Sequence, residues 1–439
     1  MSLLKTVAGH RLTKQAGKII FYVGLSRLAA VAGTIWAVRC LGPQNNGIST
    51  SLGYVLAWVS LFVGCSLDNL LIRRYKHAAT EEERRRLVEL ALSQRFFFSL
   101  ILGVAGIPVA WLLLRIFRPA GEWWLGIWAA VPLLVLTSIQ PNWVNIAQED
   151  LPVNYKASTI AGVFAALAYF LFFRPGQPAG SDLVVVAAQM VLQFVILWRA
   201  TFKRLWPLPI RWRAMREFWP VLSEGRWMFI TGMVIYVYIS LDVIMLGWFS
   251  SEQEVGKYGA AVRLVNSAQQ VLGMVPLLLF PRFVEWRKQG VEILWRKQMR
   301  LCAIFLALAV PLCGLVFVLS PLIFRLLCGA AFAESAYPFA VLFASKMMVV
   351  LNGFFAQGLW AQSEDRKVFW VLVPTAVVSL VCNLLLLPRY GMYAACWINL
   401  LSEFLVLIGC FILARRHLKQ VLAKAASPET LPTPIQPEA

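Results

Sequence analysis

Twelve apolar runs of about 20 residues follow one another along the chain, separated by polar stretches. A helix needs about 20 residues to cross a hydrocarbon core of ~30 Å. Lipid offers no water to unpaired backbone groups, so runs of this length adopt helices there. The sequence therefore predicts an all-α integral membrane protein with twelve transmembrane helices. The predicted helices are residues 18–40, 47–71, 91–114, 124–147, 155–173, 183–201, 219–248, 258–281, 301–324, 334–360, 368–387 and 391–414.

The positive charges are sorted by loop. Of 41 lysines and arginines, 31 lie on one side of the predicted membrane, seven lie on the other side and three lie inside the runs. Such an excess is typical of cytoplasmic loops, so we expect both termini in the cytoplasm. We attribute the net charge of +19 to this topology and not to nucleic-acid binding. The N-terminus lacks the pattern of a secretory signal peptide, so we expect none to be removed.

A basic stretch at residues 199–219 divides the twelve runs into two sets of six. Because each set contains an even number of helices, both sets have the same orientation, as in transporters built from parallel repeats. Residues 41–47 ("LGPQNNG") and 246–256 ("LGWFSSEQEVG") are weakly similar in the two sets. The predicted domains are an N-terminal six-helix lobe (1–210), a C-terminal six-helix lobe (211–424) and a disordered Pro-rich tail (425–439).

The chain lacks the residues that several classes of chemistry require. The sequence contains no GxxxxGK[ST] phosphate-binding loop, so we expect no nucleotide hydrolysis in this chain. The three histidines are far apart and the eight cysteines contain no CxxC pair, so we predict no metal site and no cofactor. The predicted non-cytoplasmic loops are too short to carry an outer-face glycosyl-transfer site. We therefore expect that the chain is not an enzyme.

Ionisable side chains occur inside the runs, where each costs about 2.5–3.5 kcal/mol at mid-bilayer. Arg27, Lys346 and Glu403 lie near mid-depth, whereas Asp242 and Arg263 are shallower. Such residues line an aqueous cavity, form structural ion pairs or extend toward the interface. The residues by themselves leave these alternatives open at each position.

A polar stripe runs along the segment "AVRLVNSAQQVLGMVP" at residues 261–276. Arg263, Asn266, Ser267 and Gln270 follow the spacing i, i+3, i+4, i+7, which places them on one face of a helix. Other runs carry shorter stripes, such as Lys346 with Gln357 and Asn399 with Glu403. Polar faces on several helices of both sets predict a central hydrophilic cavity, and hence a transporter.

Three stretches carry a family resemblance: "RCLGPQNNGISTSLGYV", "LDVIMLGWFSSEQEVGKYGAAVRLV" and "NLLLLPRYGMYAACWINLLSEF". They resemble the polysaccharide-precursor (O-antigen-type) flippases of the multidrug/oligosaccharidyl-lipid/polysaccharide exporter superfamily. With the number and orientation of the runs, the resemblance extends over almost the whole chain. It implies a MATE-like fold of two lobes around a central cavity. Cys396 and Trp397 depart from the small residues usual in the last stretch.

The resemblance implies alternating-access transport of a polyprenyl-pyrophosphate-linked oligosaccharide to the outer leaflet of the bacterial inner membrane. It implies that Arg27 and Arg263 are cavity cations. Arginine also suits this role chemically, because its planar guanidinium binds phosphate in a bidentate manner. The other candidate substrate-binding residues are Asn266, Gln270, Lys346 and Gln357, and the candidate ion-coupling residues are Asp242 and Glu403.

The expected partners are the lipid-linked oligosaccharide and, at the membrane, a glycan polymerase and glycosyltransferases, with the chain itself a monomer. Four alternatives remain open. They are a MATE-type ion-coupled exporter of small molecules, a lipid II flippase, an outer-face glycan polymerase or ligase, and a non-transporting scaffold. A MATE-type exporter of cations favours an acidic cavity, and lipid II flippases usually have two more helices.

Overall fold

The computed structural model describes residues 2–64, 68–117, 124–148, 150–202, 210–362 and 365–426. Every regular element within these residues is a helix, as predicted. The N-terminal half contains α1 (Ser2–Gly64), α2 (Asp68–His77), α3 (Glu81–Phe117), α4 (Trp124–Ser138), α5 (Asn142–Ala147), α6 (Leu151–Phe172) and α7 (Ser181–Thr201). The C-terminal half contains η1 (Trp212–Glu217), α8 (Phe218–Phe249), α9 (Glu252–Leu272), α10 (Met274–Gln289), α11 (Val291–Leu327), η2 (Ala330–Ser335), α12 (Ala336–Trp360) and α13 (Asp365–Ala426).

Eight stretches of helix in the described part of the chain are long and apolar enough to cross a membrane. Two of them, Phe21–Gly64 with 44 residues and Lys367–Ala423 with 57, greatly exceed the ~20 residues that one crossing needs. Each of these two contains a kink and has the length for two crossings. The chain is therefore a multi-pass membrane protein, and the exact number of twelve crossings stays a prediction.

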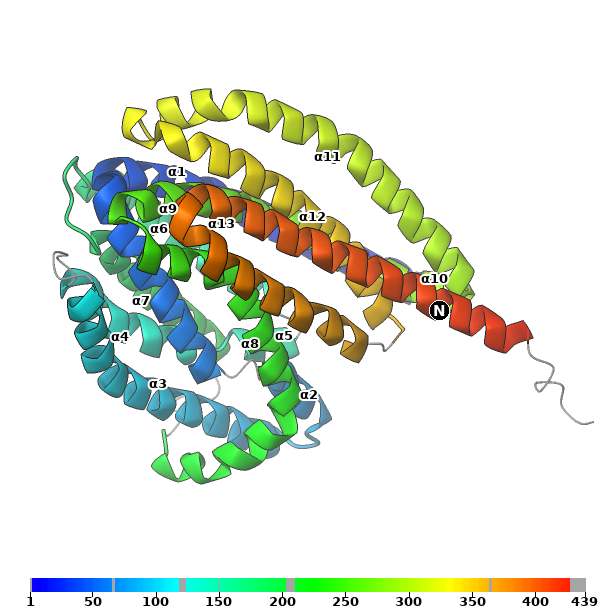
Figure 1. Ribbon diagram of the computed structural model, residues 1–439. Helices are drawn as coiled ribbons and strands as arrows, with labels where there is room; N and C mark the ends of the chain where they lie inside the picture. The colour runs from blue at the N-terminus through cyan, green and yellow to red at the C-terminus, as the bar shows by residue number, and fades with distance from the viewer. Residues whose placement is uncertain are drawn as a thin grey trace, which may run out of the picture.

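Glycines form both kinks. Gly42 bends α1 with φ 72° and ψ 171°, and Gly391 bends α13 with φ 52° and ψ −134°. A positive φ is strained for residues with a side chain and costs glycine little. Pro43 follows Gly42 directly and restrains it further, because a residue before proline disfavours the α region. The two arms of α1 are visible in blue in Figure 1.

The predicted helix at residues 124–147 is interrupted at residues 139–141, between α4 and α5. Pro141 explains the interruption, because proline has no N–H and disfavours a helical residue before it. Freed backbone groups within a membrane need partners. The carbonyl of Pro141 obtains one from the backbone N–H of Val144 at 3.0 Å.

Most helices pack against helices of their own half. In the N-terminal half α6 packs on α1 and α7, and α4 packs on α3 and α7. In the C-terminal half α12 is central, with 72% of its apolar window buried against 11% for that of the peripheral α11. The packing of α1 along α9 connects the halves. The division into two lobes stays a prediction, and residues 203–209 and 427–439, at its boundary and in the predicted tail, lie outside the described residues.

Both kinks lie at one end of the bundle, which we call the glycine end and define by residues 42–47, 252–256 and 388–391. These segments meet there, because Gly47 lies against Glu252 and Gly391 lies against Glu254. In Figure 1 the glycine end is at the upper left, and α2 and the last turns of α13 lie away from it.

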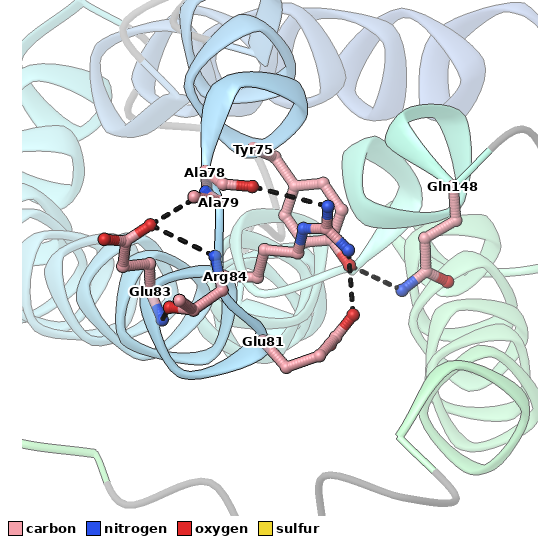
Figure 2. A network of polar contacts seen from close by, with 8 residues as sticks. Tyr75, Ala78, Ala79, Glu81, Glu83, Arg84 and Gln148 are labelled. Atoms are coloured by element: carbon pink, nitrogen blue, oxygen red, sulfur yellow. Dashed lines mark hydrogen bonds and ion pairs between the residues drawn. The ribbon is translucent and has the colours of Figure 1, made fainter.

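The three-residue segment between α2 and α3, residues 78–80, is ordered by a capping box, shown in Figure 2. The N–H of Glu83 donates to Thr80 Oγ1 at 3.2 Å, and Glu83 Oε2 accepts the N–H groups of Thr80 and Ala79 at 3.3 and 2.8 Å. Such reciprocal bonds satisfy N–H groups that have no partner within the first turn of a helix. They explain why α3 begins at Glu81.

Arg84 connects the start of α3 to the end of α2 and the residues between them. Its guanidinium donates to Glu81 Oε1 at 2.8 Å and to the Ala78 carbonyl at 3.3 Å, and lies 5.6 Å from the ring centre of Tyr75 (Figure 2). The hydroxyl of Tyr75 accepts a hydrogen bond from Gln148 Nε2 at 2.9 Å. The α2–α3 hairpin is thereby attached to the end of α5.

Candidate functional site

Arg263 of α9 contacts the other half of the protein. Its Nη1 lies 2.9 Å from Oδ2 of Asp182 at the start of α7, and its Nη2 donates to Thr50 Oγ1 of α1 at 3.3 Å. The Asp182 side chain is 3% exposed and that of Arg263 is 24% exposed. The charge predicted for a cavity wall therefore forms, in this conformation, an ion pair between the two halves.

The remaining residues of the polar stripe have different environments. Asn266 lines a cavity. Ser267 donates its hydroxyl hydrogen to the carbonyl of Arg263 at 2.9 Å, which is a bond within the helix. Gln270 is exposed. One face of α9 thus runs from an ion pair through a cavity wall to an exposed amide.

The cavity itself lies between α1, α8, α9, α12 and α13. Its polar lining consists of Tyr54, Asp242, Asn266, Lys346 and Asn399. The space within it is far smaller than the ~300–1,000 Å³ of pockets that hold drug-sized ligands. In this conformation it is too small for an oligosaccharide.

Asp242 contributes a carboxylate to this cavity and accepts hydrogen bonds on both of its oxygens. Tyr258 donates its hydroxyl hydrogen to Oδ2 at 2.5 Å, and Asn399 Nδ2 donates to the same oxygen at 3.3 Å. The backbone N–H of Val243 donates to Oδ1 at 2.9 Å. Ser345 in turn donates to Oδ1 of Asn399 at 2.7 Å, so α8, α9, α12 and α13 share one polar network.

Glu403 forms a second buried acidic centre on α13. Tyr238 donates to its Oε1 at 3.3 Å and Asn352 Nδ2 donates to its Oε2 at 2.8 Å. Lys346, which is also buried, interacts electrostatically with both Glu403 and Asp242. The sequence-predicted residues Asp242, Lys346 and Glu403 thus belong to one electrostatic cluster within the C-terminal half.

Arg27 and Gln357 lie apart from this cluster. Arg27 is half-buried on the first arm of α1, and its buried Nε has no hydrogen-bond partner among the described residues. Gln357 is buried on α12, three turns beyond Lys346. Neither residue lines the cavity at Asp242.

At the glycine end the second arm of α1 crosses α9 in direct backbone contact. Asn46 Nδ2 donates to the carbonyl of Gly256 at 2.7 Å, and Gln44 donates to Glu252 at 3.5 Å. Both Gly47 and Gly256 belong to the two segments whose similarity the sequence indicated. The two similar segments therefore pack against each other and hold the halves together at this end.

Sequence reasoning missed several residues of the site. Asp182 lies one residue before the predicted helix 183–201 and was therefore not counted among intramembrane charges. Tyr54, Tyr238 and Tyr258 lie among apolar neighbours in the sequence and were not predicted as site residues. A buried tyrosine usually needs a hydrogen-bond partner, so tyrosines inside the predicted helices were the available indication.

Comparison with known proteins identifies the family. A family model described as "Polysaccharide biosynthesis protein" matches residues 12–286, more than half of the chain. The chain belongs to this family. The resemblance seen in the sequence is thereby confirmed. A protein of Escherichia coli (strain K12) named "Putative O-antigen transporter" is 22% identical over 251 residues, which are 56% of this chain and 59% of that protein.

Solved structures confirm the MATE-like fold of this polysaccharide biosynthesis family member. The lipid II flippase MurJ in an inward closed conformation has a TM-score of 0.73 and 10% identity, with 90% of this chain and 87% of that chain covered. An inward-facing multidrug resistance MATE family transporter of the MOP superfamily has a TM-score of 0.69 and 15% identity, with 92% and 96% covered. At such identities the likeness concerns the fold alone.

Proposed function

We propose that this protein is a flippase that moves a polyprenyl-pyrophosphate-linked oligosaccharide from the cytoplasmic to the outer leaflet of the bacterial inner membrane. It acts by alternating access and performs no chemical conversion. Family membership and the MATE-like fold support transport, and the intramembrane cations support an anionic lipid as the substrate. Both termini are cytoplasmic, the glycine end faces the outside, and the protein acts as a monomer beside a glycan polymerase and glycosyltransferases.

The observation that carries this proposal is the environment of Arg27. A buried polar group of a charged side chain is costly when it has no partner. Arg27 has neither an ion pair nor a hydrogen-bond partner for its buried Nε within the described residues. A diphosphate would supply the missing charge, because guanidinium and phosphate oxygens form paired, charge-assisted hydrogen bonds. Arg27 therefore binds the diphosphate during transport.

The other candidate residues accommodate the remainder of the substrate. Arg263 is a second phosphate contact when it is not paired with Asp182. Asn266, Gln270 and Gln357 offer amides to sugar hydroxyls, and Lys346 adds a positive charge beside Asn266 at the cavity. The apolar tail stays in the bilayer, since only the head group needs a polar path across ~30 Å of hydrocarbon.

Asp242 and Glu403 provide ion coupling. With Lys346 they form a buried cluster of two carboxylates and one ammonium, which carries one excess negative charge when all three are ionised. Because burial penalises net charge, uptake of one proton or one monovalent cation stabilises the cluster. Loading and release of that ion on opposite sides of the membrane would couple transport to an ion gradient.

The same cluster favours one second candidate, a MATE-type ion-coupled exporter of small molecules. Acidic residues at a cavity attract cationic compounds. The two functions differ in the sign of the charge that they carry.

Reconstituted protein tests the proposal directly. Purified protein in liposomes is supplied with a fluorescent polyprenyl-pyrophosphate oligosaccharide, and movement between leaflets is measured as accessibility to an external quencher. We expect protein-dependent movement that excess polyprenyl pyrophosphate inhibits. Movement of a cationic fluorescent compound in its place, with no movement of the lipid-linked oligosaccharide, would establish the exporter and refute the flippase.

A further inference from the structure

The ion pair between Asp182 and Arg263 lies where the two halves are held together. Asp182 belongs to α7 and Arg263 belongs to α9, 81 residues later in the chain. Thr50, which also accepts a hydrogen bond from Arg263, lies one turn from Asn46, which donates to the carbonyl of Gly256. The pair therefore reinforces the contact that closes the glycine end.

Asp182 depends on Arg263 for charge compensation. The carboxylate is buried, and its Oδ1 has no hydrogen-bond partner within the described residues. A buried carboxylate that loses its counter-charge is strongly destabilised, whereas the same group in water is not. A conformation in which the glycine end is closed and Arg263 does not pair with Asp182 is therefore unfavourable.

Arg263 has a second anion within reach if the flippase function holds. Asn266, one helical turn away on the same face of α9, lines the cavity, so Arg263 lies within one turn of a residue that the substrate would contact there. A diphosphate carries more charge than a carboxylate and accepts bidentate hydrogen bonds from a guanidinium. Asp182 and the substrate therefore compete for the same N–H groups.

We propose that Arg263 alternates between Asp182 and the diphosphate of the substrate, and that Asp182 is a gating residue. Without substrate the Asp182–Arg263 pair holds the glycine end closed. When the diphosphate binds Arg263, Asp182 is left buried and unpaired, and opening of the glycine end relieves it by admitting water. A ligand shifts a conformational equilibrium only through different interactions with the two states, and this exchange supplies that difference. After release, Arg263 returns to Asp182. The inference rests on the proposed flippase function.

The test measures opening of the glycine end by distances between spin labels. Labels are attached to cysteines introduced at the exposed residues Pro175 and Ala333, one in each half, in a chain whose eight native cysteines are replaced by alanine. Distances are recorded in liposomes with and without polyprenyl pyrophosphate, and polyprenyl monophosphate serves as the control lipid. We expect pyrophosphate to raise the ratio of open to closed molecules about tenfold, within the range of allosteric couplings.

Variants separate the gate from general disruption. Asp182→Asn removes the charge of the side chain and retains its shape. We expect this variant to have a higher open-to-closed ratio than wild type in the absence of lipid, and we expect pyrophosphate to raise that ratio little further. Glu334→Gln is the matched control, because Glu334 pairs with Lys257 at 2.8 Å within the C-terminal half alone. An Asp182→Asn variant as closed as wild type, or as responsive to pyrophosphate, would overturn the gate.

The reversed pair Asp182→Arg/Arg263→Asp tests the exchange itself. We expect this variant to be closed without lipid, unlike Asp182→Asn, because an ion pair is retained. We do not expect oligosaccharide movement, because the cation no longer lies on α9. Full restoration of movement would refute the exchange. Binding of polyprenyl pyrophosphate to wild-type protein is measured in parallel. Absent binding refutes the flippase function as well, whereas binding without opening refutes only the gate.

Discussion

Gly47 of α1 and Gly256 of α9 lie in reciprocal contact at the glycine end. A Cβ atom on Gly47 would lie 1.9 Å from the carbonyl oxygen of Glu252, and one on Gly256 would lie 1.7 Å from that of Pro43. Each glycine thus faces the backbone segment that precedes the other. Because the obstructing atoms are backbone and not flexible side chains, neither glycine can be replaced without moving a helix.

Replacement of either glycine by alanine should open this crossing. Overpacking of a close contact costs about 1–3 kcal/mol, and here the cost falls on the closed arrangement of the halves. We expect Gly47→Ala and Gly256→Ala to raise the labelling of an introduced cysteine by a membrane-impermeant maleimide from the outside. We also expect slower transport, since the closed state is part of the cycle.

Gly53→Ala provides the control for these two variants. Gly53 lies on the same arm of α1, and nothing lies within 4 Å of a Cβ atom built on it. We expect wild-type labelling and transport. If Gly53→Ala raises labelling and slows transport as much as Gly47→Ala does, the effect results from the loss of a glycine in α1 and not from a change at the crossing.

Arg27→Ala should abolish transport while leaving the protein inserted in the membrane. The guanidinium is the proposed diphosphate contact, and a charge-assisted hydrogen bond contributes about 1.5–3 kcal/mol, so a paired contact corresponds to at least a tenfold loss of binding. Lipid-linked oligosaccharide should accumulate inside the cell and surface glycan should disappear. Arg27→Lys should retain part of the activity, because the charge remains and the paired geometry does not.

Arg39→Ala is the matched control for Arg27. Arg39 is an exposed arginine on the same arm of α1, twelve residues further along the chain. Its loss should leave surface glycan unchanged. Normal surface glycan with Arg27→Ala would contradict the role of Arg27, whatever the behaviour of Arg39.

Asp242→Asn and Glu403→Gln should remove the dependence of transport on an ion gradient. Each substitution deletes one buried negative charge and leaves the cluster neutral with Lys346, so the cluster no longer gains a proton or a cation. In proteoliposomes we expect gradient-stimulated movement to fall to the level without a gradient. Sodium and proton gradients, imposed separately, identify the ion.

The same experiment includes Glu334→Gln, which removes an exposed acid that pairs with Lys257 at 2.8 Å. This variant should respond to the gradient like wild type. Gradient stimulation that persists in both Asp242→Asn and Glu403→Gln would show that another group couples the ion.

Glu254→Ala should destabilise the kink of α13. Glu254 Oε1 accepts the backbone N–H of Met392 at 2.7 Å, directly after Gly391. The bond caps the helix that restarts there, and loss of a cap costs about 0.5–2 kcal/mol. We expect a lower thermal unfolding midpoint in detergent. Gln253→Ala, at an exposed neighbouring position, should leave the midpoint unchanged.

Gly391→Ala should cost more than Glu254→Ala. It combines a positive φ with a Cβ atom 1.9 Å from Glu254 Oε1. If the double variant with Glu254→Ala is as unstable as Gly391→Ala alone, backbone strain outweighs the clash. A midpoint for Gly391→Ala above that of Glu254→Ala would contradict both contributions.

The candidate site was only partly predictable. Polar residues in apolar runs need polar surroundings, which predicts Asp242, Lys346 and Asn266 as site residues, and the structure places all three at one cavity. The same rule predicts Gln357, which does not line that cavity. Helical periodicity states which residues share a face, and it does not state what that face contacts.

Hydropathy determined the all-α class and the placement of the helices along the chain, because every segment that enters hydrocarbon must satisfy its own backbone hydrogen bonds. The positions of lysine and arginine determined the expected orientation. Only the tertiary structure decided the partner of Arg263. Whether its charge pairs with Asp182 or faces a free cavity depends on how α7 and α9 pack, 81 residues apart. The same holds for Gly47 and Gly256, whose similarity was visible in the sequence but whose mutual contact was not. Pairing between distant residues is a property of the packed helices, and no local pattern contains it.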